Sequence, residues 1–300
     1  MIEGLICPNL TFFDSQGNLD EKTLRWHLNW ILDRGVNGLF VTGTYGSGYL
    51  MRLDERIRVY EIAKEVCDKH EGSFVIGHVG TNDTNSSLIL TKAAKDIGLD
   101  AVSAVNPYTF KYTDSELIRY YEKLVNAADG MPVFAYNNPK LTNKVIDLNL
   151  VIEFAKIGIL AIKDSTSDID YAKSIIENPF LIDLGFKYIT GSTTNWPELS
   201  KIGVDSMISG SCNYIPELVK VLFEAGLNES DSITNYYDLV NEVNNRVKSG
   251  NSTISSHIAL KARGYNAAFT KEPLFIDYEN SKVRIETLIN YFKGINLFEN

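Results

Sequence analysis

Short apolar segments rich in Val, Ile and Phe alternate with segments of helical period along the first two thirds of the chain. This alternation is typical of repeated strand–helix units that build a parallel sheet. Eight segments are predicted to be strands: 4–7, 38–42, 74–79, 101–105, 133–136, 160–163, 188–190 and 207–209. Eight such units close most naturally into an α/β (β/α)8 TIM barrel, which is the fold that we predict.

The segments between these strands are amphipathic, and we predict them to be the outer helices: 21–34, 54–69, 86–97, 114–127, 148–156, 171–176 and 216–224. From about residue 230 the strand pattern stops and helices are expected, including 231–248 and 283–292. We therefore expect a barrel over 1–225 and a helical extension over 226–300 packed against it. The alternative fold is an open doubly wound sheet. That fold would normally carry a G-x-G-x-x-G turn after its first strand, whereas this chain continues Pro8-Asn9-Leu10-Thr11-Phe12.

Composition excludes several classes of protein. The chain is 44% hydrophobic and 22% charged, and no segment approaches the roughly 18 uninterrupted apolar residues of a membrane helix. It carries 29 basic and 38 acidic residues without a basic run, so we expect no nucleic-acid partner. The three cysteines contain no CxxC spacing, which argues against a disulfide framework or structural zinc. Residues 1–4 contain neither a basic nor an apolar leader, so a cytoplasmic location is expected.

Lys163 stands at the end of the sixth predicted strand among apolar residues. Active sites of TIM barrels lie where the strands end, so this position is a candidate site. A desolvated ammonium either pairs with a carboxylate, such as the neighbouring Asp164, or has its pKa lowered until the amine becomes a nucleophile. The residue type alone does not decide between these two interpretations.

Tyr136 ends the fifth strand, next to the strand of Lys163. Adjacent parallel strands lie less than about 5 Å apart, so both side chains can reach one small ligand. Taken alone, Tyr136 could simply fill the top layer of the barrel. Beside a lysine that forms a Schiff base, its hydroxyl is instead suited to move the protons that the reaction requires.

The second strand ends in the glycine-rich turn Gly43-Thr44-Tyr45-Gly46-Ser47-Gly48. Such a turn can present backbone N–H groups and the Thr44 hydroxyl to a carboxylate or phosphate. Glycines alone are weak evidence, because any tight turn can use them. Their combination with Lys163 and Tyr136 indicates an anionic carbonyl substrate, namely an α-keto acid.

Four motifs follow one another at the predicted strand ends: Gly43-Thr44-Tyr45-Gly46, Pro107-Tyr108, Tyr136-Asn137-Asn138-Pro139 and Ile162-Lys163-Asp164-Ser165. Later matches are Gly191, Ser209-Gly210 with Asn213 and Pro216, and Glu272-Pro273-Leu274. With these motifs the chain resembles, over nearly its whole length, the dihydrodipicolinate synthase and N-acetylneuraminate lyase family of pyruvate-dependent class I aldolases.

The resemblance implies chemistry without a metal or an organic cofactor. Lys163 would attack the keto carbon of pyruvate, Tyr136 would move protons, and Thr44 with the Tyr45 amide would hold the carboxylate. Further substrate contacts are expected from Gly43, Tyr108, Ser165, Gly191 and Ser209. The expected partners are small molecules, pyruvate and an aldehyde, and the family resemblance implies a homotetramer.

Departures from the family pattern narrow the expected substrate. Tyr45 and Ser47 stand where the family usually has a small hydroxyl residue and an acid, and Thr109 stands where many members have a second tyrosine. The Gly46-Ser47-Gly48 run and residues 210–217 look more like archaeal 2-keto-3-deoxygluconate aldolases. We therefore rank cleavage of 2-keto-3-deoxygluconate to pyruvate and glyceraldehyde first. N-acetylneuraminate lyase, another pyruvate aldolase or a keto-sugar-acid dehydratase follows, and dihydrodipicolinate synthase comes after these.

The absence of a cation at position 141 predicts that the end of the substrate remote from the keto group is uncharged. Leu141 stands where dihydrodipicolinate synthases have an arginine for a second carboxylate. An unpaired anion is costly to bury, whereas hydroxyls and amides bind a neutral polyol. Such side chains are plentiful near the strand ends: Ser165, Thr166, Ser192, Thr193, Thr194, Ser209, Ser211 and Asn213. We therefore expect an unphosphorylated sugar acid.

Two rival functions come from other classes of protein. A metal-dependent class II aldolase would need histidines and carboxylates converging at the barrel mouth. Of the four histidines only His78 lies in a predicted strand, where one histidine is more often a hydrogen-bonded core residue, so no metal is expected. The second rival is a catalytically silent protein that binds a keto acid, because Tyr45 and Thr109 alter residues of the family's proton relay.

Overall fold

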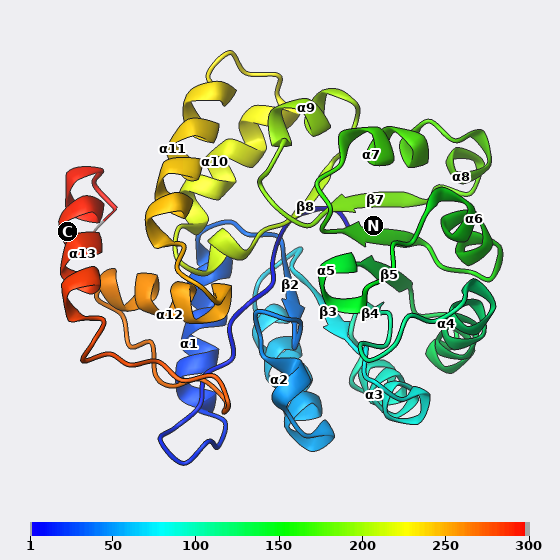
Figure 1. Ribbon diagram of the computed structural model, residues 1–300, viewed down its shortest axis with the longest axis horizontal. Helices are drawn as coiled ribbons and strands as arrows, with labels where there is room; N and C mark the ends of the chain where they lie inside the picture. Colours follow the sequence, from blue (N-terminus) through cyan, green and yellow to red (C-terminus); the bar gives the residue numbers. More distant parts are fainter. Residues whose placement is uncertain (1, 298–300) are drawn as a thin grey trace.

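The computed structural model describes residues 2–297, and its centre is a closed parallel barrel in which the strands follow one another in sequence order (Figure 1). The strands are β1 Gly4–Cys7, β2 Gly38–Val41, β3 Phe74–His78, β4 Ala101–Val105, β5 Val133–Asn137, β6 Ala161–Asp164, β7 Lys187–Thr190 and β8 Ser206–Ile208. β1 pairs with β8 and closes the barrel. All eight predicted strands are therefore confirmed, and their ends differ from the prediction by at most one residue.

The predicted outer helices are also present around the barrel (Figure 1). They are α1 Glu21–Asp33, α2 Leu53–Cys67, α3 Thr84–Ile97, α4 Asp114–Ala128, α6 Leu148–Lys156, α7 Ile169–Ile176 and α10 Pro216–Leu227. The sequence reading did not name the short helices α5 Pro139–Thr142, α8 Pro179–Asp183 and α9 Trp196–Lys201, nor the 3-10 turns η1 Gly48–Leu50 and η2 Gly210–Asn213. These elements are too short for a helical period to show in the sequence.

The C-terminal helices lie together on one side of the barrel, near α1 and α10 (Figure 1). α11 Ile233–Val247 and α13 Lys282–Gly294 correspond to the two predicted helices. The sequence reading did not name α12 Ser252–Ala262 between them. Most of α12 is buried, including its polar residues Thr253, Ser255 and Ser256. A helix that is buried on nearly all sides has no polar face, and so it lacks the amphipathic pattern that predicts a helix.

Apolar residues form two cores, one inside the barrel and one between the strands and the helices. The inner core includes Ile6, Phe40, Phe74, Ile76, Val105, Phe134, Tyr136, Ile189 and Ile208. Successive residues of a strand point to opposite faces. On β5, Phe134 and Tyr136 accordingly face inward, while Val133 and Ala135 belong to the outer core. This alternation determines which strand-end side chains reach the barrel interior.

No helix in the part of the chain that the structure describes is both long enough and apolar enough to cross a lipid bilayer.

Candidate active site

Lys163 and Tyr136 are neighbours at the ends of two paired strands. They are register partners in the pairing of β6 with β5, and both side chains are buried. The Lys163 Nζ atom lies 3.9 Å from the centroid of the Tyr136 ring and 4.1 Å from that of the Phe40 ring. The structure thus brings together the two residues that the sequence singled out, and it adds Phe40 as a second aromatic wall around the amine.

Asp164 does not pair with Lys163. As neighbours on β6, the two residues point to opposite faces of the strand. The Asp164 carboxylate instead accepts hydrogen bonds from Asn137 Nδ2 at 2.8 Å, from Tyr188 at 2.9 Å and from the Thr166 hydroxyl at 2.6 Å. The interpretation of Lys163 as half of an ion pair with Asp164 is therefore wrong, and no other carboxylate in the described residues forms a salt bridge with Lys163.

Burial lowers the pKa of the Lys163 amine below its usual 10.5, and the neighbouring Tyr136 partly offsets this effect. Removal from water disfavours the ammonium, and no carboxylate restores it. A lysine in this setting is more readily deprotonated than one on the surface. Its neutral amine is the form that can attack a carbonyl carbon.

The Tyr136 hydroxyl is held by three polar side chains. Asn138 Nδ2 donates to it at 3.0 Å, and the Ser165 and Thr44 hydroxyls also hydrogen-bond with it. Burial raises the pKa of Tyr136, but the Lys163 charge and these hydrogen bonds outweigh burial and leave the pKa below its usual 10.0. A phenol whose anion is stabilised in this way can both give and take a proton.

The loop after β2 presents unpaired backbone donors. The N–H groups of Thr44 and Tyr45 have no hydrogen-bond acceptor among the described residues. Thr42 and Ser47 adopt left-handed backbone conformations, with φ of 54° and 56°, which fold the loop back on itself. A positive φ is unusual for the β-branched Thr42, whose Oγ1 donates to His78 O at 3.1 Å. The resulting turn can hold a carboxylate, as the sequence predicts.

Two predicted glycines make room for neighbouring side chains. A Cβ atom on Gly43 would lie 2.7 Å from the Phe40 ring, and one on Gly191 would lie 2.5 Å from Ser165 Oγ. Gly43 therefore allows Phe40 to take its place beside Lys163. Gly191 leaves space for the hydroxyl of Ser165, which hydrogen-bonds Tyr136.

The remaining predicted site residues line two cavities. Thr44, Tyr108 and Leu141 border a cavity of about 600 Å³. Tyr45, Gly191 and Ser209 border another of about 260 Å³, which α11 and α12 also line. Thr44, Tyr45, Tyr108, Gly191 and Ser209 are all predicted to contact one substrate, and the structure distributes them between the two cavities.

Arg56 is a buried cation that the sequence reading did not consider, and it lines the larger cavity. Its guanidinium donates to Gly80 O at 3.2 Å and to His78 O, and its Nε has no partner. No carboxylate in the described part of the chain pairs with it. In the sequence, nothing marked Arg56 except its charge within an otherwise ordinary amphipathic helix.

His78 lies beside the candidate site as a neutral, buried ring. Its ring centroid is 6.1 Å from that of Tyr136, and its Nε2 accepts from Val105 N at 3.3 Å. Burial lowers its pKa well below 6.5, and the charges of Arg56 and Lys163 lower it further. This arrangement agrees with a hydrogen-bonded core histidine. Among the described residues, no group of three or more His, Cys, Asp or Glu is arranged to hold a metal ion.

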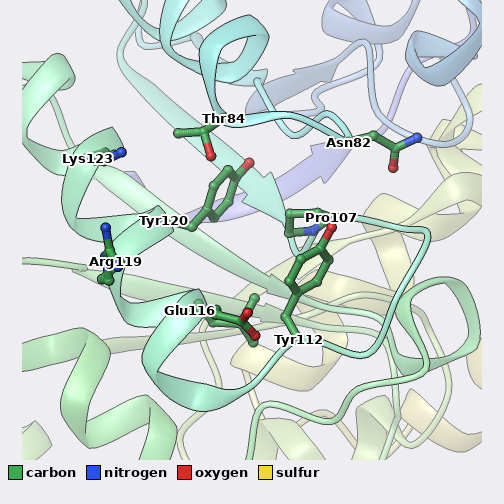
Figure 2. Close-up of a pocket in the computed structure, with 9 residues that line it drawn as sticks. Asn82, Thr84, Pro107, Tyr112, Glu116, Arg119, Tyr120 and Lys123 are labelled. Carbon is green, nitrogen blue, oxygen red and sulfur yellow. The ribbon is translucent and has the colours of Figure 1, made fainter.

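A third cavity, of about 230 Å³, is lined from α4, the start of α3 and the loops after β3 and β4, and it shares Asn82 with the cavity of about 600 Å³ (Figure 2). Its charged lining residues are Glu116, Arg119 and Lys123. None of the predicted site residues lines it. It therefore plays no part in the assignment of the site.

Comparison with known proteins relates nearly the whole chain to one family. The family model of the dihydrodipicolinate synthetase family matches residues 1–291. The N-acetylneuraminate lyase of Salmonella typhimurium is 34% identical over 170 residues, which cover 56% of this chain and 56% of that enzyme. The match thus spans little more than half the length of this relative.

Solved structures share the fold over almost the whole chain. YagE, a prophage protein of E. coli described in complex with pyruvate, has a TM-score of 0.90 at 22% identity, covering 99% of both chains. A variant of the 2-keto-3-deoxygluconate aldolase of Sulfolobus solfataricus has a TM-score of 0.86 at 22% identity, covering 98% of this chain and 96% of that one. At 22% identity, this structural similarity establishes a shared fold and nothing more specific.

Proposed function

The chain belongs to the dihydrodipicolinate synthetase family, and on that premise we propose that it is a Schiff-base (class I) aldolase. The proposed reaction is the reversible cleavage of a 2-keto-3-deoxy sugar acid to pyruvate and an aldehyde. The observation that carries the proposal is the environment of Lys163, a buried amine without a carboxylate partner beside a tyrosine hydroxyl. Such an amine is suited to attack a carbonyl and is poorly suited to a structural ion pair.

In the proposed mechanism, the Lys163 amine adds to the keto carbon of the substrate to give a carbinolamine. Tyr136 protonates the departing hydroxyl, and loss of water leaves an iminium. The Tyr136 phenolate then takes the proton of the hydroxyl on the fourth carbon. The bond between the third and fourth carbons breaks, its electron pair moves toward the iminium nitrogen, and the aldehyde leaves. The resulting enamine is protonated on carbon, and water hydrolyses the iminium to release pyruvate and the free amine.

The proposed carboxylate site is the loop after β2. The N–H groups of Thr44 and Tyr45 would bind the carboxylate oxygens, and the Thr44 hydroxyl would connect this end of the substrate to Tyr136. We assign to Gly43 and Gly191 the role of leaving space for Phe40 and Ser165, which lie next to the reacting side chains. Ser165, Ser209 and Tyr108 are proposed to border the rest of the substrate.

For the substrate we propose 2-keto-3-deoxygluconate first, with glyceraldehyde as the aldehyde product. Support comes from the cavity of about 260 Å³, whose lining is rich in serine and threonine and includes no aspartate or glutamate. Neutral hydroxyls suit a polyol, because each can donate one hydrogen bond and accept others.

N-acetylneuraminate is a second candidate substrate, favoured by the 34% identity to N-acetylneuraminate lyases over part of the chain. Steady-state cleavage of both sugar acids, with pyruvate release as the common readout, separates the two candidates. The proposal expects a higher kcat/KM for 2-keto-3-deoxygluconate. A higher value for N-acetylneuraminate would transfer the assignment to that substrate. Borohydride-trapped pyruvate without cleavage of any keto acid would identify a silent binder instead.

We further propose that residues 1–225 form the catalytic unit and that 226–300 form a supporting helical extension in a homotetramer. The contact of Thr253 Oγ1 with the carbonyl oxygens of Thr44 and Tyr45, both at 3.5 Å, supports a role of the extension in holding the site. Size-exclusion chromatography with light scattering tests the assembly.

A further inference from the structure

Tyr45 departs from the family pattern, and its side chain reaches away from the proposed carboxylate site. Its backbone belongs to the loop after β2, whereas its ring extends toward η2 and the start of α12. The side chain is partly buried against the outer core and lines the cavity of about 260 Å³. A residue that was expected to act through its amide therefore also presents a phenol to a second part of the site.

Gly210 fixes the position of the Tyr45 ring. A Cβ atom on Gly210 would lie 2.2 Å from Tyr45 Cζ and 2.4 Å from its Oη. Real side chains do not approach so closely, so the phenol end occupies the space that the glycine leaves open. The two positions depend on each other, because Tyr45 can hold this position only while residue 210 lacks a side chain.

The C-terminal extension also lies at the hydroxyl end of the Tyr45 ring. Ser252, the first residue of α12, hydrogen-bonds the Tyr45 hydroxyl. Burial raises the pKa of Tyr45 above its usual 10.0, so the group is a neutral hydroxyl at physiological pH. A phenol can donate one hydrogen bond and accept others, so one contact with Ser252 leaves capacity for a ligand.

The surroundings of this hydroxyl suit a neutral polyol. The cavity is also lined by Ser192, Thr193 and Ser211, and Lys248 is the one Lys, Arg, Asp or Glu among the described residues that line it. The Ser211 hydroxyl already donates to Asn244 at 2.8 Å, whereas Tyr45 belongs to the loop after β2 and also lines this cavity. Its backbone and its side chain therefore face two different parts of the proposed site.

We propose that Tyr45 is a specificity-determining residue whose hydroxyl, positioned by Gly210 and Ser252, binds a hydroxyl of the aldehyde-derived end of the substrate. This inference rests on the proposed aldolase function and adds a residue that selects for the polyol end. In this role Tyr45 discriminates between keto acids that share the reacting carbons and differ only beyond them.

The test compares two substrates that differ only beyond the reacting carbons. One is 2-keto-3-deoxygluconate, and the other is 4-hydroxy-2-ketopentanoate, in which a methyl group replaces the two terminal hydroxyl-bearing carbons. Tyr45→Phe should lower the ratio of kcat/KM for the first substrate to that for the second by roughly 3- to 10-fold, the effect of one neutral hydrogen bond. The matched control is Tyr278→Phe, which removes a hydroxyl that donates to Ala268 O at 3.0 Å and lines neither cavity, and it should leave the ratio unchanged.

Gly210→Ala tests the positioning separately. The added methyl group must displace the ring, so the ratio should fall as it does in Tyr45→Phe although the hydroxyl is still present. In the double variant the two losses should not add, because both remove the same contact. Melting temperatures of all variants are measured in parallel. If Gly210→Ala does not fold, the comparison of Tyr45→Phe with Tyr278→Phe decides alone.

An unchanged ratio in Tyr45→Phe would overturn the inference, and so would an equal loss for both substrates. A wrong aldolase assignment would give a different outcome. The wild-type protein would then neither trap pyruvate with borohydride nor cleave either keto acid. If the wild type does both and the ratio is insensitive to Tyr45, the aldolase assignment stands and only the role of Tyr45 is wrong.

Discussion

The Nζ atom of Lys163 lies 3.9 Å from the centroid of the Tyr136 ring, across the pairing of two neighbouring strands. Both side chains face the barrel interior, because they are register partners on adjacent parallel strands. The same alternation turns Asp164 away from the amine. A buried lysine is therefore left next to a phenol and without a carboxylate partner among the described residues.

Lys163 is expected to be the only lysine that forms a Schiff base with pyruvate. Borohydride reduction in the presence of pyruvate should add the mass of a reduced three-carbon keto acid to the peptide that contains Lys163, as measured by mass spectrometry. Lys163→Arg keeps a positive charge but should abolish labelling. Lys140→Arg, at the nearby helix α5, serves as the control and should be labelled normally. Labelling of a different lysine would refute the assignment.

Tyr136→Phe is expected to lower kcat by roughly 10²-fold or more, because it removes a general acid and base while changing almost no volume. Pyruvate trapping on Lys163 should remain partly intact. Tyr171→Phe is a suitable control, since that hydroxyl donates to Ile146 O outside the barrel, and its kcat should match the wild type. Turnover of Tyr136→Phe close to the wild-type value would show that another group moves the proton.

The unphosphorylated sugar acid is expected to be preferred over its 6-phosphorylated analogue. Leu141 supplies no cation, and the polar side chains that line the cavity of about 260 Å³ are hydroxyls and an amide apart from Lys248. The measurement is kcat/KM for both substrates at one ionic strength. The buried Arg56 gives the comparison a diagnostic variant, because it lines the larger cavity and has no carboxylate partner in the described residues. A preference for the phosphorylated compound that disappears in Arg56→Gln would show that the anion binds there.

Stability is expected to fall as the pH drops from about 6.5 toward 4. Burial lowers the pKa of His27 to about 3 and that of His257 to about 4, whereas an unfolded histidine titrates near 6.5. Below pH 6.5 the unfolded chain therefore binds more protons than the folded protein, and the free energy of unfolding decreases. By pH 5 the loss should be on the order of 2 kcal/mol for each histidine, measured by urea unfolding.

Matched variants assign this pH dependence to the two rings. His27 Nε2 contacts Asn213 Oδ1 at 3.1 Å, and His257 Nδ1 contacts Ala267 O at 2.7 Å. His27→Gln and His257→Asn keep an N–H donor near each acceptor but cannot titrate. The stability difference between pH 7 and pH 5 should therefore shrink in each variant. If it stays the same, the acid sensitivity comes from other groups.

Local sequence patterns were sufficient to predict the barrel. Strand length, helical period and the order of the units all follow from nearby residues, which explains why the eight strands were predicted to within one residue. The placement of Lys163 and Tyr136 on adjacent strands required only the order of strands, because consecutive strands of such a barrel are neighbours.

The tertiary structure decided which groups surround the amine. The partners of Asp164 come from three segments, with Tyr188 and Asn137 on the strands either side and Thr166 in the following loop. Alternation along β6 turns Asp164 away from Lys163, a point that the sequence analysis left open. However, the identity of its partners depends on strand register, which the sequence pattern does not specify to the residue.

The contacts of Tyr45 could only come from the folded chain. Thr253, which reaches the Tyr45 carbonyl, lies 208 residues away in sequence on a helix that the pattern did not predict. Likewise, Gly210 must be a glycine because the Tyr45 ring lies against it, and Tyr45 is itself a departure from the family pattern. The sequence by itself determined the barrel and its two central residues, because these depend on local periodicity. Packing between distant segments determined how far the site extends and which side chains border it, because no local pattern encodes contacts of such long sequence separation.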